Sequence, residues 1–455
     1  MIDFQKYVRY SKPGPRYTSY PTAVEFSSDF QSSAYKEALK GALKSKIPLS
    51  LYTHLPFCRS ACYFCGCNVI YTSKEEKKPR YIEYLKKELA LLKQSFDTTR
   101  EVVQFHFGGG TPTFFNAKEL ESVIKALREC FPNFAKDCEI SCEIDPRYFD
   151  VEQMRVLKEY GFNRLSFGVQ DFEECVQDAI HRKQSFEIVR NAVELARSFG
   201  IKSINFDLIY GLPFQSLQSF ERTLDSVLEL SPERLAVFNY AHVPWLKKTM
   251  RKIDETTLPR PQEKLQILQN SIEKLTKNGY EMIGMDHFAK KDDELYLAKE
   301  RKQLRRNFQG YTTKGFSQTI GVGVTSISEG VNYYAQNFKD LSLYENALDN
   351  GILPTERGIR LSKEDILRKS VIMELMNNLS LNFASIESAF GIDFKTHFAK
   401  ELSELEPFER ANLLEVNDEG IFTTPTGGML IRNIAMLFDA YLYKNVGKNT
   451  FSKTI

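Results

Sequence analysis

Residues 49–67 read LSLYTHLPFCRSACYFCGC, an apolar β-type run followed at once by a loop with four cysteines. Cys58, Cys62 and Cys65 have the spacing C-x3-C-x2-C, and Cys67 follows Cys65 after one glycine. Thiolates are soft ligands that suit iron–sulfur clusters or zinc. A zinc ribbon takes its ligands from two separated pairs, and the remaining cysteines of this chain occur singly. The spacing therefore favours an iron–sulfur cluster.

Three close cysteines on one loop leave one iron of a four-iron cluster without a protein ligand. That iron is then free to bind a small molecule through amine and carboxylate groups. Cys67 lies too near Cys65 to ligate the same cluster comfortably. We therefore predict Cys58, Cys62 and Cys65 as the metal ligands. A zinc site and a reduced loop without metal are the alternatives.

The spacing of apolar residues along 49–240 predicts strands that alternate with helices. The expected strands are 49–54, 102–107, 139–143, 164–169, 203–210 and 234–240. The expected helices are 79–96, 117–130, 151–160, 184–199 and 216–230, with a further one at 260–279. This order predicts a parallel sheet with right-handed crossovers. It fits both a curled sheet of the β/α barrel type and an open doubly wound sheet.

In either fold, ligands bind at the carboxyl ends of the strands. The chemically suggestive residues fall there: the cysteine loop after the first strand, Gly108–Gly110 after the second, then Glu143, Gln170 and Asp207. Glycines let backbone N–H groups approach a ligand closely, although a tight turn would look the same. We expect one site that these segments share.

Three regions are expected along the chain. Residues 1–48 mix turn signals with a helix near 33–45, and residues 49–354 hold the sheet with an irregular, glycine-rich stretch at 300–330. Residues 355–455 are predicted as a helical domain with a short β-like piece at 420–424.

The composition narrows the class of protein. The 455 residues carry 61 basic and 59 acidic side chains, a balance that argues against a general nucleic-acid surface. We read no signal peptide and no apolar run of membrane-spanning length. We therefore expect a cytoplasmic protein, in which clustered thiols indicate metal rather than disulfides.

The chain resembles the radical S-adenosylmethionine (SAM) superfamily, whose signature is a C-x3-C-x2-C loop after the first strand. Within that superfamily it resembles the oxygen-independent coproporphyrinogen III oxidase family. Matching motifs occupy residues 14–22, 56–67, 108–113, 145–147, 168–172, 207–213, 238–242, 284–288 and 307–313. The resemblance implies a curved partial (β/α)6 barrel with an N-terminal extension and a C-terminal helical domain. It also implies one 4Fe–4S cluster and two bound SAM molecules.

The family's cofactor contacts match a defined set of positions. They are Tyr52, Phe64, Gly109, Gly110, Thr111, Glu143, Gln170, Arg182, Asp207, Ala241 and Ile327. Glu143 and Asp207 can accept bonds from hydroxyls or an amine, and Arg182 can pair with a carboxylate. Ala241 and Ile327 offer only backbone groups or packing. Read without the family, each of the carboxylates is more often a helix cap or part of a solvated face, Phe64 could simply shield the cluster, and Tyr52 could be a core aromatic.

Tyr52 and Arg16 are the predicted catalytic residues. Strand alternation points Tyr52 the same way as His54, for which a core hydrogen bond is expected. The implied substrate, coproporphyrinogen III, carries four propionates, and an arginine is suited to bidentate carboxylate binding. Arg16 lies in the N-terminal motif and is our candidate for that contact, with Arg147, Arg305 and Arg306 as further candidates.

The resemblance implies a reaction in haem biosynthesis. A 5′-deoxyadenosyl radical made from SAM would drive the anaerobic decarboxylation of two propionates to vinyl groups, giving protoporphyrinogen IX. It also implies a flavodoxin- or ferredoxin-type electron donor and a monomer, with neither nucleic acid nor membrane as a partner. The alternatives are a haem-binding carrier and another radical SAM protein that modifies tetrapyrroles.

Overall fold

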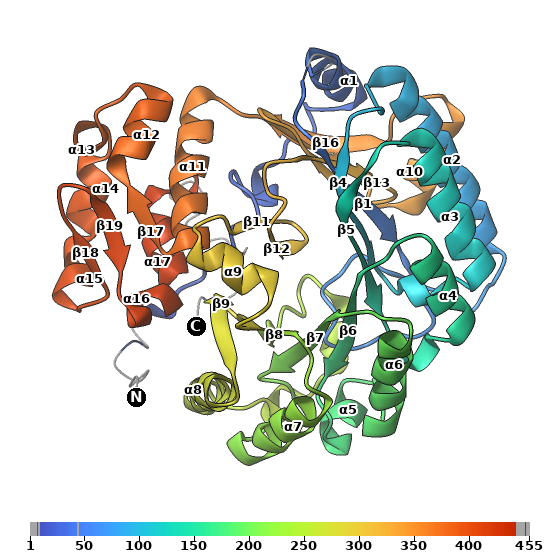
Figure 1. The fold of residues 1–455 in the computed structure, drawn as a ribbon, viewed down its shortest axis with the longest axis horizontal. Helices are drawn as coiled ribbons and strands as arrows, with labels where there is room; N and C mark the ends of the chain where they lie inside the picture. Colours follow the sequence, from blue (N-terminus) through green and yellow to red (C-terminus); the bar gives the residue numbers. More distant parts are fainter. Residues whose placement is uncertain (1–6, 8–9, 43–44, 443–450, 452–455) are drawn as a thin grey trace.

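The computed structural model describes residues 7, 10–42, 45–442 and 451. Parts of the predicted terminal regions 1–48 and 355–455 lie outside them. The main sheet has 12 strands in the order β16-β15-β14-β13-β1-β4-β5-β6-β7-β8-β10-β9. Figure 1 shows this sheet as a curved wall with a separate, mainly helical body beside it.

Six neighbouring strands of the sheet are the six that the sequence predicts. They are β1 (Leu49–Leu55), β4 (Val102–Gly109), β5 (Phe134–Ile144), β6 (Arg164–Gln170), β7 (Ser203–Tyr210) and β8 (Arg234–Asn239). They lie side by side in chain order, and each pairs in parallel with the next. A doubly wound sheet would reverse its strand order at a switch point. The observed order therefore selects winding of the barrel type.

Helices cover the outer face of the curved sheet (Figure 1). They are α2 (Lys77–Ser95), α3 (Ala117–Cys130), α4 (Val151–Glu159), α6 (Phe186–Ser198) and α7 (Leu217–Leu230). The helix α3 begins at a capping box, in which Asn116 and Glu119 bond each other's backbone N–H groups. These helices lie where the sequence predicts them. A short helix, α5 (Glu174–Ala179), was not expected.

The stretch 300–330, expected to be irregular, contains strands. The hairpin β11 (Arg305–Asn307) and β12 (Gly310–Thr312) precedes β13 (Gln318–Val322), which pairs in parallel with β1. Gly321 interrupts the apolar pattern of β13, so this strand was not predicted from the sequence. A glycine is needed at this position because a Cβ would lie 2.6 Å from the oxygen of Ile327. The sheet therefore extends beyond β1.

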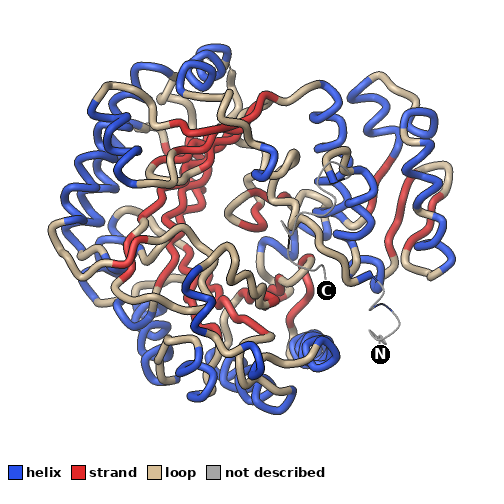
Figure 2. The backbone as a smooth tube through the Cα atoms, turned by 180° about the vertical axis from the view of Figure 1, so that it is seen from behind, coloured by secondary structure: helices blue, strands red, loops and turns tan. Residues whose placement is uncertain are grey.

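Antiparallel strands complete both sides of the sheet. On one side are β14 (Ile327–Glu329), β15 (Tyr333–Asn337) and β16 (Thr355–Arg360), and on the other β10 (His287–Lys290) and β9 (Tyr280–Gly284). The outermost strands β16 and β9 do not pair, so the barrel is open, and Figure 2 shows the same curved sheet from behind. The remaining elements of this region are α1 (Ser32–Gly41), β2 (Phe57–Cys58), β3 (Ile70–Tyr71), α8 (Pro261–Lys277), α9 (Glu294–Glu300) and α10 (Leu341–Asp349).

The C-terminal body is mainly helical. Its helices are α11 (Lys363–Asn378), α12 (Phe383–Phe390), α13 (Phe394–His397), α14 (Ala399–Glu404), α15 (Glu406–Arg410), α16 (Pro425–Met429) and α17 (Ile431–Ala435). The expected β-like piece is β19 (Gly420–Thr423), which pairs with the unpredicted β17 (Ser380–Asn382) and β18 (Leu414–Val416). The main sheet ends at Arg360, and we propose the boundary between the two bodies directly after it.

The N-terminal segment packs on the C-terminal body rather than standing alone. Tyr10, Tyr17 and Tyr20 belong to its buried apolar cluster. The Tyr17 hydroxyl donates to Oδ2 of Asp439 at 2.9 Å, and Nε of Arg432 donates to the Pro15 carbonyl at 3.0 Å. The first described residues are therefore held by the last ones.

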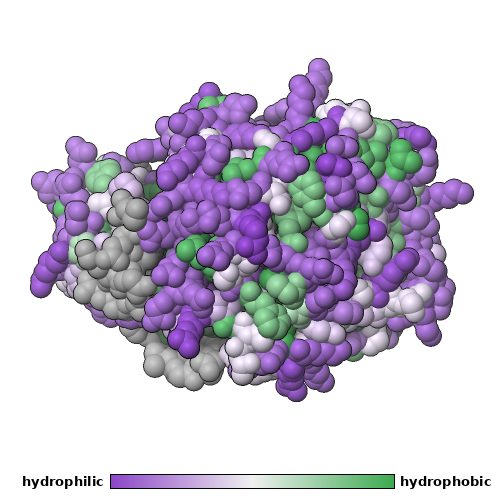
Figure 3. Space-filling view, turned by 90° about the horizontal axis from the view of Figure 1, so that it is seen from below, coloured by the Kyte–Doolittle hydropathy of each residue, from purple (hydrophilic) through white to green (hydrophobic). Residues whose placement is uncertain are grey.

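The surface gives no sign of a membrane-spanning helix. Within the described ranges, every helix is too short or too polar to cross a bilayer. Seen from below, hydrophilic side chains dominate and the hydrophobic areas are separate from one another (Figure 3).

Candidate active site

A cavity of about 450 Å³ lies inside the curved sheet. All four loop cysteines line it, and so do eight of the predicted cofactor-binding residues: Phe64, Gly109, Gly110, Thr111, Glu143, Gln170, Arg182 and Asp207. Residues from five different strands or strand ends thus meet at one place. This is the shared site that the strand-end argument predicts.

The cysteine loop is held against the barrel by backbone and side-chain bonds. Tyr63 donates its N–H to the Ile180 carbonyl at 2.9 Å. Sγ of Cys58 lies 3.3 Å from Oγ1 of Thr111, and Nη1 of Arg182 lies 3.7 Å from Sγ of Cys62. These contacts aim the thiols of Cys58 and Cys62 at the glycine turn and the arginine, whereas Cys67 is exposed.

The turn after β4 needs its glycines. Gly109 has φ +119°, and a Cβ on it would lie 2.7 Å from the His54 ring. A Cβ on Gly110 would lie 2.5 Å from the Pro56 carbonyl oxygen. The Gly109 N–H donates to Oε2 of Glu143 at 3.1 Å. Only glycine lets this backbone run so close to the start of the cysteine loop.

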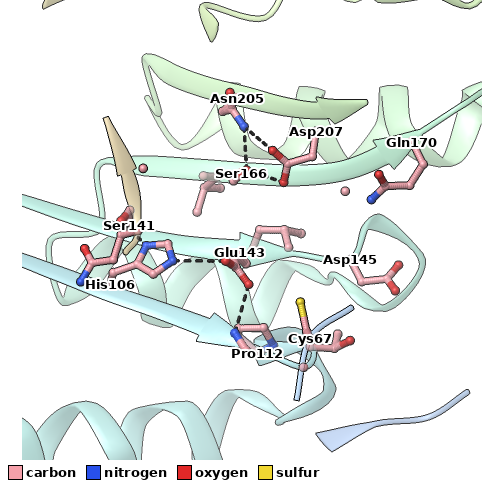
Figure 4. A pocket seen from close by; sticks show the side chains of 18 of the residues that line it. Cys67, His106, Pro112, Ser141, Glu143, Asp145, Ser166, Gln170, Asn205 and Asp207 are labelled. Atoms are coloured by element: carbon pink, nitrogen blue, oxygen red, sulfur yellow. Dashed lines mark hydrogen bonds and ion pairs between the residues drawn. The ribbon is translucent and has the colours of Figure 1, made fainter. Parts of the chain in front are cut away.

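The inner face of the barrel is polar, as Figure 4 shows. A ring nitrogen of His106, Nδ1, lies 2.7 Å from Oγ of Ser141, and Nε2 lies 3.4 Å from Oε1 of Glu143. Branched apolar side chains fill most barrels of this kind. A polar interior bonded in this way is suited to holding a polar ligand.

A second bonded group lies on β6 and β7. Nδ2 of Asn205 donates to Oδ1 of Asp207 at 2.9 Å and to Oγ of Ser166 at 2.8 Å (Figure 4). Burial, with a further contribution from the nearby Glu143, raises the pKa of Asp207 to about 6. Sequence reasoning missed His106, Ser141, Ser166 and Asn205. Their alternation with apolar residues along each strand was the signal that marked them.

Two of the predicted residues carry buried polar atoms without a partner. Nη2 of Arg182 donates to the Gly168 carbonyl at 2.7 Å, and its Nη1 pairs with Asp145 at 3.1 Å. Its Nε, and Oε1 of Gln170, are buried with no hydrogen bond among the described residues. Because buried polar atoms are normally bonded, both atoms indicate room for a ligand.

Four predicted residues do not line the cavity within the described part of the chain: Tyr52, Arg16, Ala241 and Ile327. The Tyr52 ring stacks on His106 at 5.9 Å, and its hydroxyl lies 3.0 Å from Nδ1 of His54. Tyr52 and His54 therefore do point the same way, and His54 is buried with a second bond to the Asn68 carbonyl. Tyr52 therefore contacts the cavity only indirectly, through the His106 ring that lines it.

Arg16 lies behind the side chains that form one wall of the cavity. It pairs with Asp286 and lies over the ring of Phe238, 5.4 Å from its centroid. Phe238 and His287 line the cavity, so Arg16 is separated from it by one layer of side chains. Its side chain is 33% exposed.

Comparisons with known proteins show the family of the chain. The family model described as "Radical SAM superfamily" matches residues 52–227, and "HemN C-terminal domain" matches residues 361–430. The oxygen-independent coproporphyrinogen III oxidase of Helicobacter pylori is 64% identical, with 100% of this chain and 99% of the relative covered. The chain belongs to the oxygen-independent coproporphyrinogen III oxidase family. The resemblance drawn from its motifs is confirmed.

Other members of the family agree. The enzyme of Escherichia coli with the same name is 46% identical, covering 98% of this chain and 97% of the relative. The solved structure titled "Coproporphyrinogen III oxidase (HemN) from Escherichia coli is a Radical SAM enzyme" has a TM-score of 0.92, covering 96% of this chain and 99% of that one. The radical SAM fold with a C-terminal helical domain is thereby confirmed.

Family membership implies a 4Fe–4S cluster and SAM, and the residues fit them. Three thiols stand on one loop at the cavity wall, beside a glycine turn and unpartnered buried atoms. Among the described residues no three His, Cys, Asp or Glu side chains converge on one metal-ion position. In a 4Fe–4S cluster each cysteine thiolate binds a separate iron, so three thiols on one loop would hold three of the four irons.

Proposed function

We propose that this chain converts coproporphyrinogen III to protoporphyrinogen IX without oxygen, by oxidative decarboxylation of two propionates. One observation carries the proposal: the three-cysteine loop and the glycine turn face a single polar cavity, in a chain closely similar to enzymes named for this reaction. Each propionate loses a hydrogen atom to the radical made from SAM, then carbon dioxide and one electron, which passes to a one-electron acceptor, and a vinyl group is left.

The cofactor assignment follows the geometry. Cys58, Cys62 and Cys65 would hold the cluster, with Thr111 and Arg182 supporting the first two thiols. When bound, the cluster and SAM supply the carbon radical that accepts the hydrogen atom. We place SAM against the glycine turn, Glu143, Gln170 and Asp207, and we propose two SAM molecules in all. Phe64, Ala241 and Ile327 would contribute packing or backbone contacts.

The two predicted catalytic residues take different roles. Arg16 would bind a substrate propionate, because it carries a fixed positive charge next to the cavity wall formed by Phe238 and His287. Tyr52 would act as a positioning residue, because its ring supports His106 and His106 contacts Glu143. The buried Asp286 holds Arg16 in place.

The last part of the proposal concerns where the protein acts, its oligomeric state and its electron donor. We propose a cytoplasmic monomer that receives electrons from a flavodoxin- or ferredoxin-type protein. Such a donor is needed because the radical chemistry begins with one electron delivered to the cluster.

An anaerobic assay tests the proposal. The reconstituted protein, with SAM, a chemical reductant and coproporphyrinogen III, is expected to form vinyl product that is detected by mass. Cys58→Ala should lose the cluster absorbance and the turnover, while Cys175→Ala, an exposed cysteine outside the loop, should keep both. Tight haem binding without vinyl product would overturn the oxidase assignment in favour of a carrier. A full cluster in Cys58→Ala would overturn the ligand assignment.

A further inference from the structure

Residues 243–252, which read VPWLKKTMRK, form a surface segment with two exposed apolar side chains at its centre. We name it the cover segment. Trp245, which is 55% exposed, is the only tryptophan of the chain, and its neighbour Leu246 is 62% exposed. Exposed large apolar side chains placed together mark surfaces that bind a partner.

The cover segment lies directly on the cysteine loop. Nζ of Lys247 donates to the Cys67 carbonyl at 2.8 Å, and Nζ of Lys252 lies 4.9 Å from the centroid of the Tyr63 ring. Val243 and Tyr63 both pack against the same buried apolar cluster. The loop that lines the cavity is thus also contacted by the exposed cover segment, which places that segment close to the predicted cluster ligands.

The cover segment is strongly basic. It holds Lys247, Lys248, Arg251 and Lys252 and no acidic residue. Lys248, Arg251 and Lys252 are exposed. Within the described part of the chain, no ion pair with a carboxylate is formed by any of the four. The two acidic residues that follow have local partners. The Asp254 carboxylate accepts a hydrogen bond from the Thr256 N–H, and the Glu255 carboxylate contacts the ring of His242.

We infer that the cover segment is the docking surface for a small acidic one-electron-carrier protein. The inference rests on the proposed function and adds the place where its electron enters. Tryptophan and arginine are enriched in interface hot spots, and the segment holds Trp245 and Arg251, while the positive charge of its lysines would steer an acidic carrier to this face. The carrier is oxidised by one electron and the cluster is reduced by one electron, with no bond made or broken.

The chain as a whole carries a charge of only +2, so this basic surface is a local feature. Charge steering raises association rates by about 10- to 1,000-fold and is screened by salt within about 10 Å at 0.1 M. Binding through the cover segment should therefore weaken as salt is added.

The test uses the cluster-loaded protein and a plant-type [2Fe–2S] ferredoxin as the acidic carrier. The variant is Trp245→Ala/Lys248→Glu/Lys252→Glu, and the matched charge control is Lys158→Glu/Lys202→Glu. Both control lysines are exposed, and Lys202 directly precedes β7 at the amino end of the strands. Two quantities are measured: the Kd for ferredoxin by calorimetry, and the rate of cluster reduction by ferredoxin and by dithionite.

We expect the variant to bind ferredoxin and to be reduced by it roughly 10- to 100-fold more weakly and slowly at low salt. Reduction by dithionite should stay unchanged, and the control should behave as wild type. Equal loss with dithionite, equal loss in the control, or unchanged ferredoxin binding would each overturn the docking surface. Failure of the proposed function would look different, because the wild type would then form no vinyl product in the anaerobic assay, whatever its affinity for ferredoxin.

Discussion

The variant Gly110→Ala tests whether the close approach of the glycine turn to the cysteine loop is needed for function. The new Cβ would lie 2.5 Å from the Pro56 oxygen and 2.9 Å from the Phe57 oxygen. Both atoms belong to backbone that directly precedes Cys58, so the clash cannot be relieved by a side-chain rotation. The strain must move either the turn or the start of the cysteine loop.

The expected size of the effect follows from the overlap. Ordinary contact begins at 3.4 Å, so the backbone must give by about 0.9 Å. Overpacking of this kind costs about 1–3 kcal/mol of folding free energy. A displacement near 1 Å at reacting groups lowers turnover about 100-fold. We therefore expect a folded protein with a small loss of stability and a large loss of activity.

Gly66→Ala is the matched control, because it lies inside the cysteine loop and a Cβ there meets nothing within 4 Å. Both variants are reconstituted anaerobically, and iron content, visible absorbance, urea midpoint and vinyl product are measured. If Gly110→Ala kept wild-type iron content and turnover, the close approach of the turn to the loop would have no functional role. Equal losses in Gly66→Ala would also refute the reasoning.

Three further outcomes are expected. Asp286→Asn removes the charged partner of Arg16 and should lower the free energy of unfolding by about 2 kcal/mol, less than for a fully buried pair because Arg16 is 33% exposed. It should also raise the KM for the porphyrinogen. An unchanged KM would show that Arg16 does not bind the substrate. Cys67→Ser should retain about four irons per chain, and loss of iron would make Cys67 a ligand. Burial raises the pKa of Glu88 to about 7 from 4.5, so the folded state holds the proton longer than the unfolded state. Relative to Glu88→Gln, the wild type should therefore lose about 3 kcal/mol of stability between about pH 5 and pH 8, measured by urea midpoints, and a constant difference would contradict the shift.

Much of the fold was predictable because its strands are either buried runs or regular alternations. The six parallel strands and the five helices between them have full-length patterns, and four of these helices, α3, α4, α6 and α7, begin at a capping side chain. The strand β13 was missed because it is only five residues long and contains Gly321. Its role depends on pairing with β1, about 270 residues away in sequence, which no local pattern records.

The site was predictable where a motif carried it. The cysteine loop and the glycine turn are local in sequence, and the structure brings both to one cavity. His106 and Asn205 were missed because each looks like a solvated strand residue until the sheet curls and encloses it. Arg16 shows the converse: its ion pair with Asp286 spans 270 positions and is a product of tertiary structure alone.

The packing of the N-terminal segment on the C-terminal body determines when during synthesis that segment can dock. Tyr10, Tyr17 and Tyr20 are buried by residues 367–438, and Asp439 receives the Tyr17 hydroxyl. A ribosome makes these tyrosines before the barrel strands and makes residues 367–439 after them, so the N-terminal segment cannot dock until the barrel strands have emerged. Arg16 reaches Asp286 only with that docking. A chain that stopped before residue 367 would therefore lack the surface on which the segment that carries Arg16 packs.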